Sequence, residues 1–359
     1  MAIISFKEVG ITAMAGAVPK QVIDNYKYTE FFPEDQVKAV VDKIGVFKRR
    51  FADDKTCSSD LCYAAAEKLF KDNEINREEI DLLVFISQTP DYRMPATSIT
   101  LQHRLGLSSS CIAFDINLGC SAFIYGLSVV YGMMQSGNIR KALILDGETR
   151  SKVYSPKDRR SAFIFGDGGI AALIECNEKF GKSFFSLNSD GSRADLIMIP
   201  AGGYRKMSSA ETVVEKVVDE YGNMRSEEQG YMKGDQVFNF VIREIPRDIK
   251  KTIEYAGMTN EDFDYIVFHQ ANNFINSYIA KKMRLDTTKI PSTISKFGNT
   301  SSVSVPLTII SELKDKLKGN KCLLMSAFGV GMTWATGIVP FSDCKISDIV
   351  EVENGIPLD

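Results

Sequence analysis

The chain is poor in histidine and tryptophan, with two histidines and one tryptophan among 359 residues. It also lacks any apolar run near the roughly 20 residues that a membrane-spanning helix needs, so membrane insertion is not expected. The formal net charge is −3, and without a concentrated basic surface we expect no nucleic-acid binding. The first residues, MAIISFKEVG, contain no basic segment before a long apolar stretch. We therefore expect a soluble, cytoplasmic protein.

The seven cysteines are odd in number and show no CxxC spacing. This pattern is typical of a reducing compartment and argues against a disulfide framework or a zinc site. We expect no metal and no cofactor. Cys111, Cys176 and Cys322 lie in or beside apolar runs, where a thiol behaves as a small hydrophobic side chain. Cys120 differs because it follows a glycine at the start of an apolar helical pattern.

Strand-like runs alternate with helical patterns along the chain, which predicts an α/β fold. Among the predicted strands is KIPSTI at 289–294. With 44% apolar and 25% charged residues, the composition is that of a globular protein with a sizeable core. A polar, turn-like stretch near 175–185 marks a boundary between two halves, residues 1–178 and residues 179–359.

The two halves repeat one pattern at an offset of about 180 residues. Residues 101–148 and 279–329 both read as helix, turn, short strand, glycine with a polar residue, helix and strand. In this register Cys120 corresponds to Asn299. The apolar composition of the helices that follow these two residues predicts that both helices are buried between two sheets. Different polar residues at matching positions of a duplicated scaffold are typical of a shared active site.

Cys120 is the candidate nucleophile. At the N-terminus of a buried helix, unpaired backbone N–H groups and the helix dipole favour negative charge, so we expect a stabilised thiolate. The alternative is a small core residue at a close contact between helices.

Because histidine is rare in this chain, its positions are informative. His269 follows an apolar strand and precedes Gln-Ala-Asn, where the first half has Ser87, and we predict that it pairs with the cysteine. His103 lies in a helical pattern before a turn and is interpreted as a surface or structural residue. Asn299 is a further candidate, although it would serve equally as the N-cap of the next helix.

Two segments lie outside the repeat. Residues 200–232 mix glycine, serine and charged residues, and we expect a surface excursion that roofs a pocket. The polar tail after Phe341 is expected to wrap the surface.

The order of several motifs carries a family resemblance that covers most of the chain. The motifs are TPDYRMPATSITLQHRLG, DINLGCSAF, KDRRSAFIFGDGG, HQANNFI, KFGNTSSVSVPL and SAFGVGMTWATG. With Cys120, His269 and Asn299 in these places, the sequence resembles the 3-oxoacyl-[acyl-carrier-protein] synthase III family, condensing enzymes of the thiolase superfamily. The resemblance implies a thiolase-like, duplicated five-layer α-β-α-β-α architecture and a homodimer.

The resemblance also implies a two-stage reaction. Cys120 would take an acyl group from a thioester and pass it to the carbanion made by decarboxylating malonyl-ACP, the malonyl thioester of acyl carrier protein. His269 and Asn299 would donate hydrogen bonds to the malonyl thioester oxygen, and the N–H groups of Cys120 and Val330 would form an oxyanion hole.

Contacts with other molecules follow from the same resemblance. Arg159 would lie beside the adenine of CoA, and Met94 would reach across the dimer interface to line the partner's acyl pocket. Lys281 and Lys282 would meet an acidic acyl carrier protein.

The chain departs from the family pattern at two of these contacts. Family members that use acetyl-CoA stack the adenine on a tryptophan, but the aligned residue here is about Ala39 and the single tryptophan is Trp334. Phe274 occupies a position where the family usually has arginine.

The sequence leaves the acyl chain, the pathway and the donor, acyl-CoA or acyl-ACP, open. One alternative is acyl transfer from Cys120 to a hydroxyl or amine acceptor without decarboxylation. An alternative of another class is a non-catalytic scaffold or chain-length partner.

Overall fold

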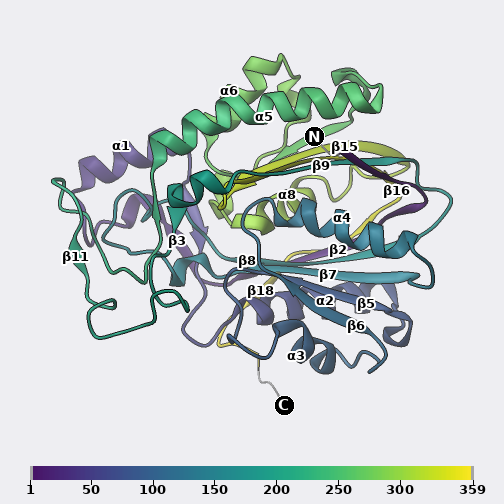
Figure 1. Ribbon diagram of the computed structural model, residues 1–359, viewed down its shortest axis with the longest axis horizontal. Helices are drawn as coiled ribbons and strands as arrows, with labels where there is room; N and C mark the ends of the chain where they lie inside the picture. Colours follow the sequence, from purple (N-terminus) through teal and green to yellow (C-terminus); the bar gives the residue numbers. More distant parts are fainter. Residues whose placement is uncertain (1–2, 357–359) are drawn as a thin grey trace.

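Two β-sheets alternate with three layers of helices in the computed structural model, which describes residues 3–356 (Figure 1). One pair of helices covers each outer sheet face, and a third pair lies between the sheets. The outer pairs are α2 (Ser58–Asn73) with α3 (Thr97–Arg104), and α5 (Gly234–Ala256) with α6 (Asn273–Met283); the inner pair is α4 (Ala122–Gln135) with α8 (Ser304–Glu312). The expected five-layer α-β-α-β-α architecture is confirmed.

The first sheet has seven strands in the order β17-β2-β8-β7-β5-β6, with β18 also paired to β2. Strand β5 runs parallel to β6 and β7, whereas β8 is antiparallel to both of its neighbours, β7 and β2. The bounds are β2, Val9–Pro19; β5, Leu82–Ile86; β6, Ile112–Ile116; β7, Lys141–Glu148; β8, Gly168–Cys176; β17, Lys345–Ile346; and β18, Val350–Val352.

The second sheet repeats this arrangement in five strands, in the order β1-β9-β16-β15-β14. Strands β9, β16, β15 and β14 have the order and relative directions of β2, β8, β7 and β5. The bounds are β1, Ile3–Phe6; β9, Ser183–Ser189; β14, Tyr265–Phe268; β15, Asn320–Gly329; and β16, Thr333–Ser342. The duplication read from the sequence is therefore a duplication of the sheets.

The prediction of a strand at 289–294 is wrong. As a result, strand β6 has no counterpart in the second sheet. This segment contains Pro291, which cannot donate a ladder hydrogen bond. Its polar groups bond elsewhere, because the Ser292 hydroxyl and the Thr293 N–H both donate to Gln270 Oε1, at 2.9 and 3.0 Å.

Each end of the chain pairs with the sheet that the other half of the chain forms. Strand β1 pairs with β9 in the second sheet, whereas β17 and β18 pair with β2 in the first. The tail after Phe341 therefore does not merely wrap the surface; it adds strands to an edge that would otherwise expose unpaired backbone groups. The division into residues 1–178 and 179–359 stays a prediction, with both terminal strands placed in the sheet of the opposite half.

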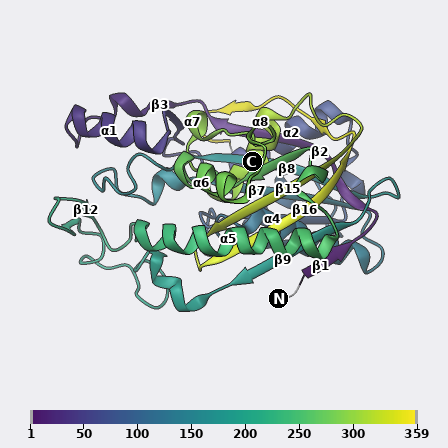
Figure 2. The ribbon, with the colours of Figure 1, turned by 90° about the horizontal axis from the view of Figure 1, so that it is seen from above.

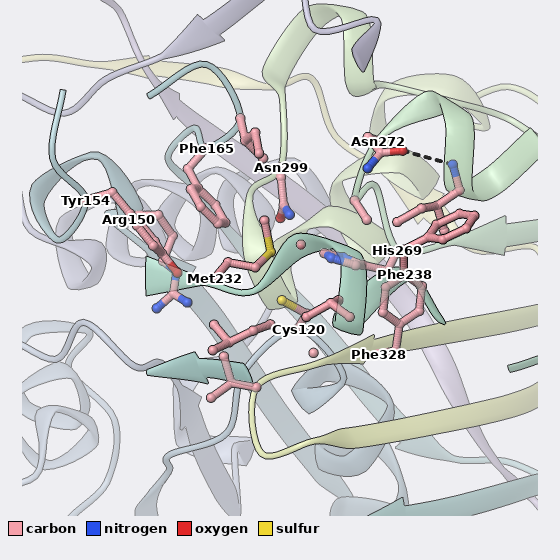
Figure 3. A pocket seen from close by; sticks show the side chains of 18 of the residues that line it. Cys120, Arg150, Tyr154, Phe165, Met232, Phe238, His269, Asn272, Asn299 and Phe328 are labelled. Carbon is pink, nitrogen blue, oxygen red and sulfur yellow. Dashed lines mark hydrogen bonds between the residues drawn. The ribbon is translucent and has the colours of Figure 1, made fainter. Parts of the chain in front are cut away.

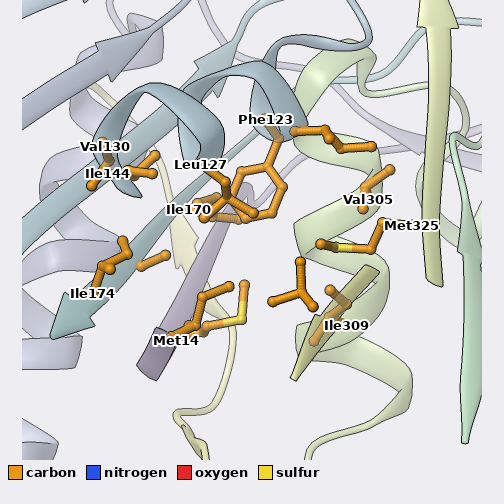
Figure 4. Close-up of a cluster of buried hydrophobic side chains, with 14 of the residues drawn as sticks. Met14, Phe123, Leu127, Val130, Ile144, Ile170, Ile174, Val305, Ile309 and Met325 are labelled. Carbon is orange, nitrogen blue, oxygen red and sulfur yellow. The ribbon is translucent and has the colours of Figure 1, made fainter. Parts of the chain in front are cut away.

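The layer between the sheets forms the main apolar core (Figure 4). Phe123 and Leu127 of α4 lie here with Val305 and Ile309 of α8, and each is at most 1% exposed. Met14 on β2 lies against the same cluster. The burial predicted for the two central helices from their composition is confirmed.

A projection at one end of the layers combines helix α1 with the excursion predicted at 200–232 (Figures 1 and 2). Residues 203–211 are exposed, which confirms a surface excursion. The remaining strands and α-helices are β3, Val22–Asp24; α1, Glu34–Ile44; β4, Lys48–Arg50; β10, Ile197–Met198; β11, Lys216–Val217; β12, Met224–Arg225; β13, Tyr231–Met232; and α7, Ile294–Phe297.

Across residues 3–356, no helix has the length and apolarity needed to span a bilayer.

Truncating Phe123 tests the central layer. Phe123→Ala removes a buried ring between the two sheets and should lower the free energy of unfolding by about 3 to 5 kcal/mol, because the cavity cannot collapse fully. Denaturant titration measures the change. Val129→Ala, on the 38% exposed side chain of the same helix, is the control and should cost less than about 1 kcal/mol. Equal losses in the two variants would contradict the assignment of this core.

Candidate active site

Cys120, His269 and Asn299 meet in one enclosed pocket of about 130 Å³ (Figure 3). Cys120 lies just before α4, His269 just after β14, and Asn299 between α7 and the helical turn that leads into α8. Their exposed fractions are 6%, 1% and 6%. The sequence prediction that these residues share one cavity is confirmed, because the duplicated helices α4 and α8 begin side by side between the sheets.

The Cys120 thiol is tightly enclosed. Its Sγ atom lies 3.6 Å from the Ser301 hydroxyl, and a Cβ atom at Gly329 would come within 2.8 Å of it. Burial raises the pKa of the Cys120 thiol, and the nearby positive charge of Arg150 opposes that rise. Loss of water therefore opposes the stabilised thiolate expected from the helix start, and the thiolate stays a prediction.

His269 is a neutral imidazole whose Nδ1 side is fixed by a hydrogen bond. Burial lowers the pKa of His269 to about 3, although a backbone hydrogen bond with Ser301 opposes the shift. Its Nδ1 lies 2.7 Å from the Ser304 hydroxyl, and that hydroxyl accepts the Gln270 N–H at 3.3 Å. Among residues 3–356, Nδ1 of His269 is the acceptor available to the hydroxyl proton of Ser304. We therefore infer that Nδ1 carries no proton and that Nε2 carries the ring proton.

Asn299 is oriented by its own loop. Its Oδ1 accepts the Ser301 N–H at 2.9 Å, which leaves the side-chain NH2 group as a donor. The N-cap role that the sequence also offered is wrong, because Thr300 caps the turn Ser301–Val303 and Val303 caps α8. Its backbone is fixed from both sides, because its N–H donates to the Ile164 carbonyl at 2.9 Å and its carbonyl accepts from Gly166 at 3.1 Å. Both Asn299 and His269 thus offer an N–H group in the pocket that contains the thiol.

Val330 lies against the nucleophile's loop. It lines the pocket next to Gly329, and a Cβ atom at Gly119 would lie 3.1 Å from the Val330 Cβ. The valine side chain therefore narrows this side of the pocket.

The other predicted contact residues lie outside this pocket. Arg159 is half-buried, donates to Gln36 Oε1 at 2.7 Å and lines a separate cavity beside α1. Met94 is 77% exposed. Lys281 and Lys282 are exposed on α6, and Lys282 donates to the Ile242 carbonyl at 2.6 Å.

Sequence reasoning missed three buried polar residues around the site. Arg150 and Glu148, 4% and 0% exposed, follow the apolar core of β7, and Ser304 begins α8. For Arg150 and Glu148, the signal in the sequence is two charged residues close to the end of an apolar strand, in the half that carries Cys120. That signal is weak, since charged residues after a strand more often belong to a solvated loop.

Comparison with known proteins agrees with this geometry. Residues 114–191 match the family model for 3-oxoacyl-[acyl-carrier-protein (ACP)] synthase III, and residues 253–341 match the model for its C-terminal part. A beta-ketoacyl-[acyl-carrier-protein] synthase III of Caldanaerobacter subterraneus is 31% identical over 335 residues, 93% of this chain and 98% of that protein. The chain belongs to the 3-oxoacyl-[acyl-carrier-protein] synthase III family.

Further members of this family lead to the same assignment. A synthase III of Streptococcus pneumoniae is 32% identical over 333 residues, 92% of this chain and 98% of that protein. The crystal structure of a 3-oxoacyl-(acyl-carrier protein) synthase from Burkholderia xenovorans superposes with a TM-score of 0.92 at 36% identity, covering 98% of this chain and 99% of that chain.

We expect His269 to stay neutral throughout the physiological pH range. Its pKa is about 3 in the folded chain against an ordinary value of 6.5, so the unfolded chain binds the proton first and this residue's contribution to stability falls as the pH drops below 6.5. Nitrogen-15 NMR of labelled imidazoles should show one pyrrole-type and one pyridine-type nitrogen at pH 5. Assignment uses His103→Gln, which leaves a single histidine. An imidazolium spectrum for His269 at pH 5 would contradict this electrostatic description.

Proposed function

We propose that this chain catalyses the decarboxylative Claisen condensation of an acyl thioester with a malonyl thioester, through an acyl-Cys120 intermediate. The observation that carries the proposal is the convergence of one thiol and two N–H donors, from His269 and Asn299, in one buried pocket. Such a reaction requires a nucleophile and donors for two oxyanions. It needs no base to remove a carbon-bound proton, because loss of CO2 supplies the carbanion.

In the first half-reaction, Cys120 receives the acyl group. An S–C bond forms at Sγ while the donor's C–S bond breaks, and the thiol proton leaves with the donor's sulfur. The carbonyl oxygen becomes an oxyanion in the tetrahedral intermediate, where the backbone N–H groups of Cys120 and Val330 would stabilise it. The raised pKa of the buried thiol suits an attack in which the proton is lost as the bond forms rather than before it.

In the second half-reaction, the malonyl thioester loses CO2. The electron pair of the broken C–C bond becomes an enolate, and His269 Nε2–H and the Asn299 NH2 group would donate to its oxygen. The carbanion then attacks the acyl carbonyl on Cys120, a C–C bond forms, and the C–S bond breaks to leave the Cys120 thiolate, which takes a proton from solvent to regenerate the thiol. A neutral imidazole suits this role, because it donates a hydrogen bond without protonating the enolate, and Ser304 holds it in the required tautomer.

An acyl carrier protein is the proposed macromolecular partner. Four basic side chains surround a surface cavity of about 620 Å³ formed by α5 and α6: Arg243, Arg247, Lys250 and Lys282. Lys281 is exposed on the same helix as Lys282. Glu244 pairs with Arg243 and Arg247, and Glu254 pairs with Lys250, so this surface keeps a modest positive excess, which would steer an acidic carrier toward the enzyme. Arg159 stays the proposed contact for CoA, in a cavity that also contains Lys43 and Lys233.

A homodimer is also proposed. Met94 is 77% exposed, and contact with a second copy would remove this large apolar side chain from water. In that arrangement Met94 would line the partner's acyl pocket.

Replacement of the nucleophile tests the first half-reaction. Cys120→Ala should abolish the mass increase of one acyl group that the wild type shows after incubation with acyl thioesters, because its thiol is the acceptor. Intact-mass spectrometry measures this. Cys111→Ala removes another buried thiol and should leave the adduct unchanged. An adduct that persists in Cys120→Ala refutes the proposal, and acyl transfer to an alcohol or amine without CO2 release would replace it with the alternative reaction.

The two N–H donors are tested by separating the half-reactions. His269→Ala and Asn299→Ala should each lower malonyl decarboxylation by about 10²- to 10³-fold, since a missing oxyanion donor costs that much. Self-acylation should change much less, because backbone N–H groups would stabilise the oxyanion of that half-reaction. Release of CO2 and the acylation rate are followed in parallel, with His103→Ala as the control histidine. Equal losses in both half-reactions would contradict this division of roles.

A further inference from the structure

Arg150 is a buried cation that lines three cavities, two of which matter for the acyl group. It is 4% exposed and lines both the pocket that contains Cys120 and a neighbouring cavity of about 470 Å³. Figure 3 shows its guanidinium beside Tyr154 at the edge of the pocket. The two cavities also share Tyr154, Ile197 and Val330. The second cavity is therefore next to an acyl group bound to the thiol. Below, this neighbouring space is called the acyl cavity.

The charge of Arg150 is only partly satisfied by the chain itself. Its guanidinium carbon lies 5.6 Å from the centroid of the Tyr154 ring and 5.9 Å from that of the Phe165 ring, which gives weak cation–π contacts. Among the described residues 3–356, its Nε has no hydrogen-bond partner, and its Nη1 reaches Gln88 Oε1 only at 3.5 Å. The nearest carboxylate oxygen, Glu148 Oε2, lies 4.0 Å away. Both oxygens of Glu148 are already acceptors, Oε1 from the Gln88 N–H and the Ser301 hydroxyl and Oε2 from the Thr89 hydroxyl.

The acyl cavity has one polar side and one apolar side. Gln88, Asn117, Arg150 and Tyr154 contribute the polar side. The apolar side comes from Ile197, Met198, Ile199, Ala201 and Val330. A plain alkyl chain would contact the apolar side, but it would leave the buried guanidinium without a close carboxylate partner, which is costly. A carboxylate would instead accept two parallel N–H bonds from the same guanidinium.

We propose that the acyl group transferred to Cys120 ends in a carboxylate, which Arg150 binds at the inner end of the acyl cavity. The substrate class is thus a thioester of a short dicarboxylic acid, with methylene groups along the apolar side and the distal carboxylate on the guanidinium. This inference rests on the proposed function, because it concerns the primer of the same reaction.

A second charged group fixes the direction of this binding. Glu228 lines the outer part of the acyl cavity together with Gly202 and Gly203, and one of its oxygens accepts from the Thr212 hydroxyl. Its negative charge would repel a carboxylate placed near it. The anionic end therefore lies toward Arg150 rather than toward the Glu228 rim.

A donor comparison on the wild-type chain tests the inference without any mutation. Glutaryl, glutaramyl and pentanoyl thioesters, each supplied on CoA and on an acyl carrier protein, share one chain length and differ in their ends. Quenched intact-mass spectrometry gives the rate of Cys120 acylation by each. Glutaryl should react at least about ten-fold faster than pentanoyl, because the alkyl end leaves the buried cation unpaired, and the neutral amide should fall between them.

Arg150→Leu should remove this preference and make pentanoyl the faster donor, since the cavity then lacks its cation. Arg150→Gln keeps a polar side chain without the charge and should lower the glutaryl rate while sparing the glutaramyl rate. Arg77→Leu is the control; that partly buried arginine pairs with Glu67, on the far side of the first sheet from the pocket. Thermal unfolding of each variant shows that the fold is retained.

The outcomes separate the two proposals. Faster acylation of the wild type by pentanoyl, or an unchanged donor ratio in Arg150→Leu, overturns the carboxylate inference and leaves the condensation intact. Loss of malonyl decarboxylation in Arg150→Leu with an unchanged donor ratio assigns the guanidinium to the second substrate, and this also overturns the inference. Absence of acylation by every donor refutes the proposed function itself.

Discussion

A small set of buried hydrogen bonds between the two halves holds the active site together. The Ser302 hydroxyl donates to Asp146 Oδ1 at 2.6 Å, and the Ser301 hydroxyl connects Cys120 with Glu148. These groups are buried where the end of β7 meets the starts of α4 and α8, so their hydrogen bonds are made within the protein, although Asp146 Oδ2 has no partner among the described residues. The position of the thiol relative to the two N–H donors depends on this contact, because it fixes the register of one half against the other.

Duplication explains how such a site arises from a repeated framework. Each half presents one helix start at the central layer, and the polar residue before that start is cysteine in one half and asparagine in the other. Strand β5 is followed directly by Ser87, and its counterpart β14 is followed directly by His269. The same backbone geometry therefore supplies a nucleophile on one side and donors on the other, and the asymmetry lies in the side chains.

The electrostatics of the pocket follow from its burial more than from any single charge. Loss of water raises the pKa of the Cys120 thiol and lowers that of His269, so burial favours the neutral form of both before substrate enters. Arg150 then supplies the positive charge near the thiol, because Glu148 lies too far from it to form a full ion pair. In a buried pocket of low dielectric a cation of this kind discriminates strongly among the groups that approach it.

The sequence by itself determined the repeated α/β pattern and the three residues that converge, because periodic apolar runs fix strands and helices, and rare polar residues at matching positions of a repeat mark a site. It did not determine the missing strand at 289–294, where the Gln270 side chain takes the polar groups that a neighbouring strand would have bound. Nor did it reveal the exchange of terminal strands, the tautomer set by Ser304 or the environment of Arg150. Only the tertiary structure decided these features, because hydrogen-bond partners and loss of water come from residues that are distant in sequence.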